Sequence, residues 1–402
     1  MGLAPRLATS WASMKLDTRN LTSSRVSILR LLFLVILFCC GAYILFLPLS
    51  YIFHGMSIHN SKPVILEPGE DAIKHFAGSR ECGILQEDVY TAPWPLDPKV
   101  SPFCGKRAGL LEALSGGGRY GFDEPFVGKD CTYRWFSTPE ICMIIERFNA
   151  ITFVGDDIAQ SIYSAFNILL REDLALGGLQ QWTMSDEDKA KCRCHNQFLD
   201  IECQRFAVKS SDDVKKNDSG DRKGSPYFCD CKSQKLLAKF AVAEKKDVPH
   251  EFISVNSVPT SPASQTNYED LTYGKSNPWQ PSPMIFSFGH GSAFDTGIAT
   301  RAIDEWSTLA TGAERNIPML FISPPAFGIN KAPSSAPRTG NLAAWNFHTE
   351  MAPVAKEKHF DVLSLYNLTL QASSVDGERF GEEVALVQAM MIINWLSKLE
   401  TS

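Results

Sequence analysis

Short apolar runs recur along the chain from residue 151 onward, each followed by polar or turn-forming residues. Runs of this length, bounded by turn signals, are typical of buried β-strands. Four such strands are predicted, with the sequences ITFVG, PMIFSF, PMLFIS and FDVLSL, at 151–155, 283–288, 318–323 and 360–365. Apolar residues also recur at helical spacing from Ile158 to Leu169 and from Val384 to Trp395. Strands that alternate with helices predict an α/β fold, with a parallel sheet covered by helices on both faces.

The segment from about 185 to 280 interrupts this alternation and is predicted to be an insertion. Its stretch KSSDDVKKNDSGDRKGS, at 209–225, is charged and rich in Ser and Gly, which predicts a mobile loop. The stretch SVPTSPASQ, at 257–265, has a similar polar composition and predicts a second loop.

An uncharged stretch near the N-terminus, LLFLVILFCCGAYILFLPLSYIF at 31–53, is long enough for a helix to cross the hydrocarbon layer of a bilayer, about 30 Å thick. Residues 1–30 are basic, so the positive-inside rule predicts a cytosolic tail and a type II topology. A cleaved signal peptide is the alternative, but its apolar region is usually shorter. We therefore expect a bilayer anchor, a polar stem at 54–80 and a lumenal domain at 81–402, in the secretory pathway.

The charge balance narrows the range of partners. The chain of 402 residues has a net charge of −6 at pH 7, and its apolar content of 44% is ordinary for a globular protein. Nucleic acids are bound chiefly through Lys and Arg, so this acidic balance disfavours a nucleic-acid partner. The sequence has no glycine-rich dinucleotide fingerprint and no P-loop, so no cofactor is predicted.

Nine cysteines follow the predicted anchor: Cys82, Cys104, Cys131, Cys142, Cys192, Cys194, Cys203, Cys229 and Cys231. In an oxidising lumen they would form up to four disulfides and leave one thiol. Zinc is an alternative for the cluster of Cys192, Cys194, His195, Cys203, Cys229 and Cys231, but structural zinc usually has wider cysteine spacing. Disulfides that staple the insertion are the favoured interpretation. Sequons at Asn217 and Asn367 predict a glycoprotein if the domain is lumenal.

The first predicted strand enters its helix through the turn FVGDDIAQ. Such strand-turn-helix junctions often present a nucleophile, but this one has Asp156 and Asp157 and no Ser, Thr or Cys at the turn. In the simplest interpretation Asp157 caps the helix, since Asp is favoured at helix N-termini. Alternatively, the two carboxylates hold a divalent metal, or one is a covalent nucleophile. Ser161 lies one helical turn further on, too far away to replace a nucleophile at the turn.

Several short blocks, taken in order, resemble a known family. They are Cys131-Thr-Tyr-Arg-Trp135, Cys142, Phe153-Val-Gly-Asp156, Phe288-Gly-His290 and Asp376-Gly377. Over about 131–398 they resemble the PC-esterase (trichome-birefringence-like) branch of the SGNH, or GDSL-type, hydrolases. This resemblance implies an SGNH-like three-layer α/β/α domain, a Golgi anchor, and transfer of O-acetyl groups to or from glycans.

The resemblance also implies site residues, and the chain departs from the family pattern at two of them. In the family, a Gly-Asp-Ser block supplies the serine nucleophile, and an Asp-x-x-His block supplies the orienting acid and the base. Here Asp157 stands at the serine position and Arg379 at the histidine position. Asp156 and Asp376 keep their matches. His290 matches the middle block, which implies an oxyanion donor; a histidine satisfied by packing is the alternative.

These two replacements remove the acyl-serine mechanism. A carboxylate at a helix N-terminus is stabilised as an anion and is a weak nucleophile. Arginine keeps its proton above pH ~12 and cannot act as the base. Because their charges are complementary, we predict a bidentate ion pair between Asp157 and Arg379.

The predicted function is therefore binding of a glycan or polysaccharide, or of a partner enzyme, without acyl transfer. One alternative is an active glycan O-acyltransferase, esterase or hydrolase that uses Asp156, Asp157 and His290, with or without a metal. A purely structural scaffold in the secretory membrane is the third class.

Overall fold

The part of the chain that can be described is the domain predicted to be lumenal. The computed structural model describes residues 71–93, 101–217, 248–273, 279–331 and 340–400. The predicted tail, the predicted bilayer anchor at 31–53 and most of the predicted stem lie outside these residues. Among the described residues, no helix combines the length and the apolar character that crossing a bilayer requires.

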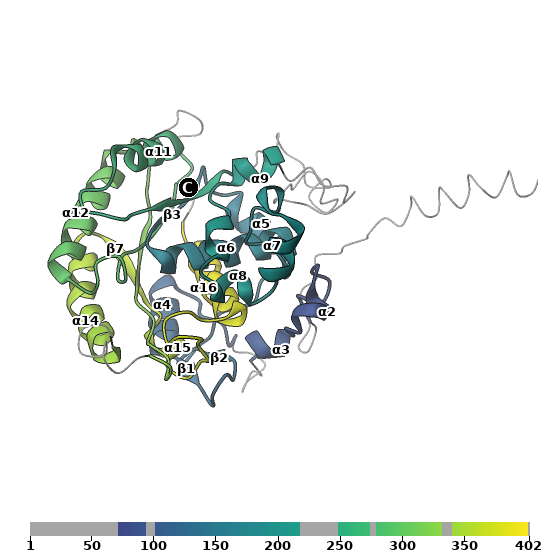
Figure 1. Ribbon diagram of the computed structural model, residues 1–402. Coiled ribbons are helices and arrows are strands. Elements are labelled where there is room, and N and C mark those ends of the chain that lie inside the picture. Colours follow the sequence, from purple (N-terminus) through teal and green to yellow (C-terminus); the bar gives the residue numbers. More distant parts are fainter. Residues whose placement is uncertain (1–70, 94–100, 218–247, 274–278, 332–339, 401–402) are drawn as a thin grey trace, which may run out of the picture. The chain divides into compact units, whose positions relative to one another are not determined.

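A five-stranded parallel sheet forms the centre of the domain (Figure 1). In spatial order its strands are β4 (His250–Ser254), β3 (Ile151–Gly155), β5 (Met284–Ser287), β6 (Met319–Ser323) and β7 (Phe360–Ser364). Phe153 of β3 pairs in register with Phe252 of β4 and with Ile285 of β5. The four strands predicted from apolar runs and their parallel arrangement are confirmed.

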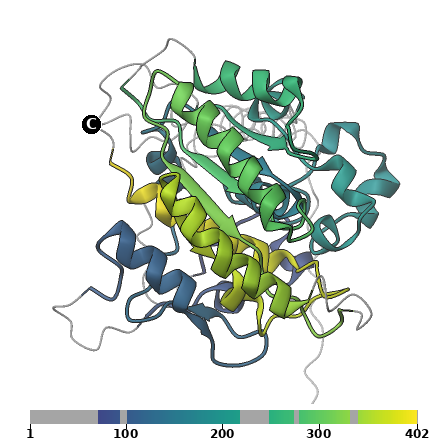
Figure 2. The same ribbon diagram turned by 90° about the vertical axis from the view of Figure 1, so that its left-hand side faces the viewer.

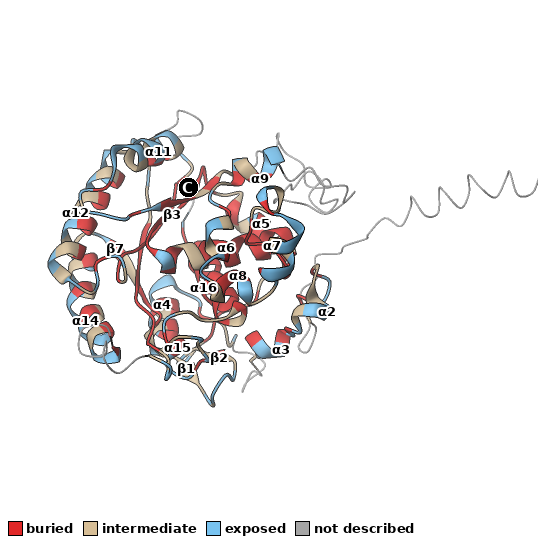
Figure 3. Cartoon of the chain, in the orientation of Figure 1, coloured by how far each residue is buried: buried red, intermediate tan, exposed pale blue. Residues whose placement is uncertain are grey.

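Two hydrophobic cores cover the two faces of the sheet, because successive strand residues point to opposite sides. Phe153 and Leu320 belong to one core, whereas their neighbours Val154 and Phe321 belong to the other. The first core includes helices α4 (Arg107–Gly116), α5 (Thr138–Ile145), α6 (Asp157–Arg171) and α16 (Glu382–Ser397). The second includes α11 (Pro262–Thr272), α12 (Thr296–Gly312) and α14 (Asn341–Glu357), which lie toward the viewer in Figure 2. The domain therefore has three α/β/α layers, with the buried strands in the middle (Figure 3).

Helices α6 and α16 pack against each other and account for the two helical patterns in the sequence. The predicted apolar face of α6, from Ile158 to Leu169, is buried. Helix α16 is buried at nearly every position up to Leu396, including the polar residue Gln388. A helix that is apolar on almost every side belongs to the core, so a polar side chain on it requires an explanation.

Short elements surround this framework. β1 (Gly118–Arg119) pairs antiparallel with β2 (Phe126–Val127) in a separate small sheet. The short helices are α2 (Ser79–Cys82), α3 (Gln86–Val89), α7 (Asp186–Lys191), α8 (Asn196–Leu199), α9 (Ser211–Asn217) and α15 (Tyr366–Thr369). Two 3₁₀ helices, η1 (Gln181–Thr183) and η2 (Cys203–Phe206), lie between α6 and α9 in the sequence.

The structure revises two predicted boundaries. Residues 71–80 were predicted to belong to the stem, but Ile73 and Phe76 are buried in the first core. The segment 185–280 was predicted to be an insertion, yet it supplies β4, and its two predicted loops contain α9 and the first residues of α11. The sequence HEFIS of β4 did not predict a strand because it is short and carries Glu251 at the edge of the sheet, where polar residues are tolerated.

Disulfides staple the domain, as predicted. Bonds join Cys82 to Cys194, Cys104 to Cys131, and Cys192 to Cys203. Their sulfurs are therefore not free to bind zinc at the cluster that suggested it. The third bond encloses the segment that carries α8, and the first ties the start of that segment to Cys82. This segment forms part of the site described below. Cys229 and Cys231 lie outside the described residues.

Candidate functional site

The candidate site lies where the sheet changes direction. Numbered along the chain, the five strands have the order 2-1-3-4-5, so β3 lies between its two successors, β4 and β5. The connection from β3 to β4 runs over one face through α6, and that from β4 to β5 runs over the other through α11. Open α/β sheets bind ligands in the crevice at such a switch point, beyond the carboxyl ends of the strands. Asp156 and Asp157 follow β3 at this point, and His290 follows β5.

A glycine allows the chain to turn here. Gly155 has φ of +142°, a conformation that L side chains rarely adopt, and a Cβ added to it would lie 1.7 Å from the carbonyl oxygen of Ser287. The next residue, Asp156, donates its backbone N–H to that same oxygen at 3.1 Å. The close approach of β3 and β5 thus depends on Gly155, and it brings the residues after both strands together.

Asp156 joins helix α6 to the loop after β5. It is buried, and it is the N-cap of α6: one carboxylate oxygen accepts from the N–H of Ile158 at 3.3 Å, and the other accepts from the N–H of Gly291 at 3.0 Å. The capping role expected for Asp157 therefore belongs to Asp156. Burial, followed by the charge of Asp157, raises the pKa of Asp156 to about 6.

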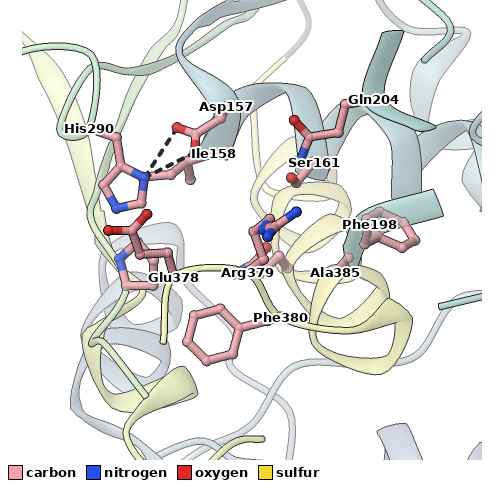
Figure 4. A pocket seen from close by; sticks show the side chains of 12 residues that line it. Asp157, Ile158, Ser161, Phe198, Gln204, His290, Glu378, Arg379, Phe380 and Ala385 are labelled. Atoms are coloured by element: carbon pink, nitrogen blue, oxygen red, sulfur yellow. Dashed lines mark hydrogen bonds and ion pairs between the residues drawn. The ribbon is translucent and has the colours of Figure 1, made fainter. Parts of the chain in front are cut away.

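Asp157 is bound to His290. Both of its carboxylate oxygens lie near the Nδ1 atom of His290, at 3.2 and 3.1 Å, and Figure 4 shows the two side chains turned toward each other. Burial works against the charge of either group, but the hydrogen bond and the opposite charge outweigh it. The pKa of Asp157 is consequently lowered and that of His290 is raised. The contact therefore favours the charged form of each group.

The rest of the His290 ring is enclosed by aromatic side chains. It stacks on Phe327 with 5.8 Å between ring centroids, and it meets Phe294 edge-on at 5.7 Å. Its Nε2 atom is buried and has no hydrogen-bond partner among the described residues. His290 was predicted to be either a site residue or a histidine satisfied by packing. It is both, because its ring packs against aromatic side chains and its Nδ1 atom reaches Asp157 in the site.

Arg379 is held by Asp376 and not by Asp157, so the predicted ion pair is wrong. Nε and Nη2 of Arg379 lie 2.8 and 2.7 Å from one oxygen of Asp376, and Nη1 donates to the carbonyl of Leu199. The other oxygen of Asp376 accepts from the backbone N–H of Arg379 at 2.9 Å. Gly377, with φ of +84°, allows this tight turn, which brings the two side chains together locally before either can reach another partner.

A small cavity of about 40 Å³, which opens to a wider mouth on the surface, connects these groups. Asp157, His290 and Arg379 line it, while Asp156 and Asp376 support its wall from behind. The structure therefore brings all five predicted site residues to one end of the sheet. The other lining residues are Ile158, Ser161, Phe198, Gln204, Pro325, Glu378, Phe380, Ala385 and Gln388, most of which are labelled in Figure 4.

Three uncharged polar side chains in this wall were not predicted as site residues. Gln388 is only 5% exposed, and Ser161 and Gln204 are partly buried. None of the three side chains has a hydrogen-bond partner among the described residues. A signal existed for Gln388, because it is a polar residue on a helix that is otherwise almost entirely apolar. No sequence signal distinguishes Gln204, since its position depends on the disulfide of its neighbour Cys203.

The geometry does not favour a metal at the paired aspartates. Asp156 accepts from two backbone N–H groups, and Asp157 is turned to His290. Among the described residues, the one group of three or more metal-ligating side chains close enough to share an ion is Glu81, Cys82 and Cys194, and its two cysteines form a disulfide.

Comparisons of the chain with family models, with curated proteins and with solved structures found no match.

Proposed function

We propose that this protein binds a glycan in the cavity at the switch point of the sheet and does not transfer acyl groups. The observation that carries the proposal is the hydrogen bond between Asp157 and His290. An acyl-enzyme mechanism needs a hydroxyl or thiol beside a neutral imidazole that can accept its proton. Here the partner of the imidazole is a carboxylate, whose hydrogen bond and charge raise the pKa of His290, and no hydroxyl or thiol stands at the turn for the ring to deprotonate.

The other parts of the site agree with a binding role. The guanidinium of Arg379 is fixed by Asp376 and cannot act as a base. The lining combines flat apolar faces, from Phe198 and Phe380, with uncharged hydrogen-bonding groups. Sugars offer both CH faces and hydroxyl groups to a pocket of this kind.

The resemblance to PC-esterase proteins supports the setting that we propose. In that setting, residues 31–53 anchor the protein in a Golgi or other secretory bilayer with type II topology, and the described domain faces the lumen. The ligand is then a glycan or polysaccharide, presented alone or by a partner enzyme. The disulfides of the domain agree with an oxidising compartment.

The test measures two properties of the full-length chain, purified in detergent. Acetyl-ester hydrolysis and acetyl transfer are assayed for the wild type, for Asp157→Ser, for Arg379→His and for the double variant. Binding of oligosaccharides is measured by calorimetry. We expect the wild type to bind at least one oligosaccharide and to show no acyl turnover. Wild-type turnover that is lost in Asp157→Ser would refute the binding role.

A second function is favoured by one observation, the unpartnered Nε2 atom of His290. A histidine oriented by a carboxylate through Nδ1 has the arrangement of a general base that activates water. Under this alternative the protein is an active glycan esterase or hydrolase, and Asp157→Asn abolishes the turnover. Repeating the assay with and without a divalent metal tests the metal-assisted form of the same idea.

A further inference from the structure

The charged groups of the cavity wall are already paired within the chain. Asp157 pairs with His290, Arg379 pairs with Asp376, and Glu378 pairs with Lys331. An anionic ligand would gain from Arg379 only by competing with Asp376, which contacts both Nε and Nη2. A charged ligand group that enters this cavity loses its hydration and meets no unpaired group of opposite charge, so its binding is disfavoured.

The uncharged polar groups of the wall, unlike the charged ones, have no partner among the described residues. Gln388 is only 5% exposed as a residue, lines the cavity, and its side-chain amide has no partner among the described residues. Gln204 and Ser161 leave their side-chain donors and acceptors free in the same wall. Polar side chains that line a cavity and are not engaged by the protein are available to hydrogen-bond a ligand that displaces water from it.

We infer that the cavity is selective for an uncharged sugar, and that Gln388 and Gln204 determine this selectivity. This inference rests on the proposed function and specifies its ligand: the free amides bind hydroxyl or amide groups of the sugar, while Phe198 and Phe380 contact its apolar face. A carboxyl-bearing sugar of the same size binds weakly, because the only guanidinium that lines the described cavity is committed to Asp376.

The experiment compares neutral and acidic ligands of equal length on the full-length chain in detergent. The probes are a neutral xylo-oligosaccharide, a neutral N-acetylglucosamine oligomer and an oligogalacturonate, titrated by calorimetry. We expect at least one neutral oligomer to bind about tenfold or more tightly than the acidic one. Gln204→Leu and Gln388→Leu each lower that affinity about tenfold, the effect of an unpaired buried polar group. The control Gln371→Leu, at an exposed position outside the cavity, leaves it unchanged.

A gain-of-binding variant makes the test independent of any loss of folding. Asp376→Asn removes the carboxylate that holds Arg379, so the affinity for oligogalacturonate should rise several-fold relative to wild type. The inference is overturned if wild type binds oligogalacturonate as tightly as the neutral oligomers, or if Gln204→Leu and Gln388→Leu bind like Gln371→Leu; glycan binding itself would then stand. Failure to bind any of the oligosaccharides would overturn the proposed function and this inference with it.

Discussion

The change Asp156→Asn should alter the stability of the domain in a direction that depends on pH. The carboxylate of Asp156 is buried and accepts from two backbone N–H groups, on Ile158 and Gly291. Asparagine has nearly the same shape but only one acceptor oxygen, so one of these hydrogen bonds is lost at every pH. The loss costs about 1 kcal/mol.

A second contribution appears only when Asp156 is ionised. Burial raises the pKa of Asp156 from 3.8 to about 6, so the folded protein binds a proton that the unfolded chain has already released. The free energy of unfolding therefore falls as pH rises from about 4 to about 6, and the shift corresponds to about 3 kcal/mol. Asparagine does not ionise, so the variant does not show this fall in the free energy of unfolding. We expect the variant to be about 1 kcal/mol less stable than wild type near pH 4 and about 2 kcal/mol more stable at pH 7.5.

The assay is urea unfolding of the full-length chain in detergent, with disulfides intact, followed by tryptophan fluorescence at pH 4 and at pH 7.5. Asp186→Asn, which replaces an exposed carboxylate at the start of α7, is the matched control and should give the same small difference at both pH values. The reasoning is refuted if the difference in unfolding free energy between Asp156→Asn and wild type has the same sign and size at both pH values. In that case the ionisation of buried Asp156 costs no stability.

Two further predictions concern the same turn. Gly155→Ala should destabilise the domain by at least about 3 kcal/mol, since the added methyl group meets the Ser287 carbonyl oxygen at a positive φ. The control is Gly109→Ala on α4, where nothing lies within 4 Å of the added methyl group. Equal yields of folded protein for the two variants would contradict the prediction. Asp157→Asn should lower the pKa of His290, because burial then acts without the opposing carboxylate. An NMR titration of the imidazole measures this pKa. An unchanged value would show that Asp157 does not raise the pKa of His290.

The sequence predicted the interior of the fold better than its edge. Strands β3, β5 and β6 are short runs of apolar residues, because both sides of a central parallel strand are buried. Strand β7 lies at one edge of the sheet, but its run FDVLS is still apolar enough to predict a strand. Strand β4 lies at the edge of the sheet, and its polar residues hide it among the loops of the 185–280 segment. The N-terminal boundary was missed for a similar reason, since only a few residues of 71–80, such as Ile73, contact the core.

For the site, the sequence predicted the residues but not their pairing. Asp157 and Arg379 have opposite charges, and sequence reasoning could not compare their possible partners. The loop after β5 places His290 beside Asp157, and the turn at Gly377 places Asp376 beside Arg379, three residues away in the sequence. Such competition is decided by backbone geometry, which the charges alone do not reveal. Gln204 was beyond prediction, because a disulfide and not a local pattern places it.

The two disulfides around α8 determine how the cavity responds to a ligand. Cys82–Cys194 and Cys192–Cys203 fix both ends of the segment that carries Phe198, and they hold Gln204 beside its end. A wall fixed by covalent bonds is already ordered before binding, so a ligand that fits loses little free energy in ordering it. The same rigidity prevents the wall from moving aside for a bulkier ligand. Ligands with larger substituents are therefore excluded by shape, in addition to any selection by charge.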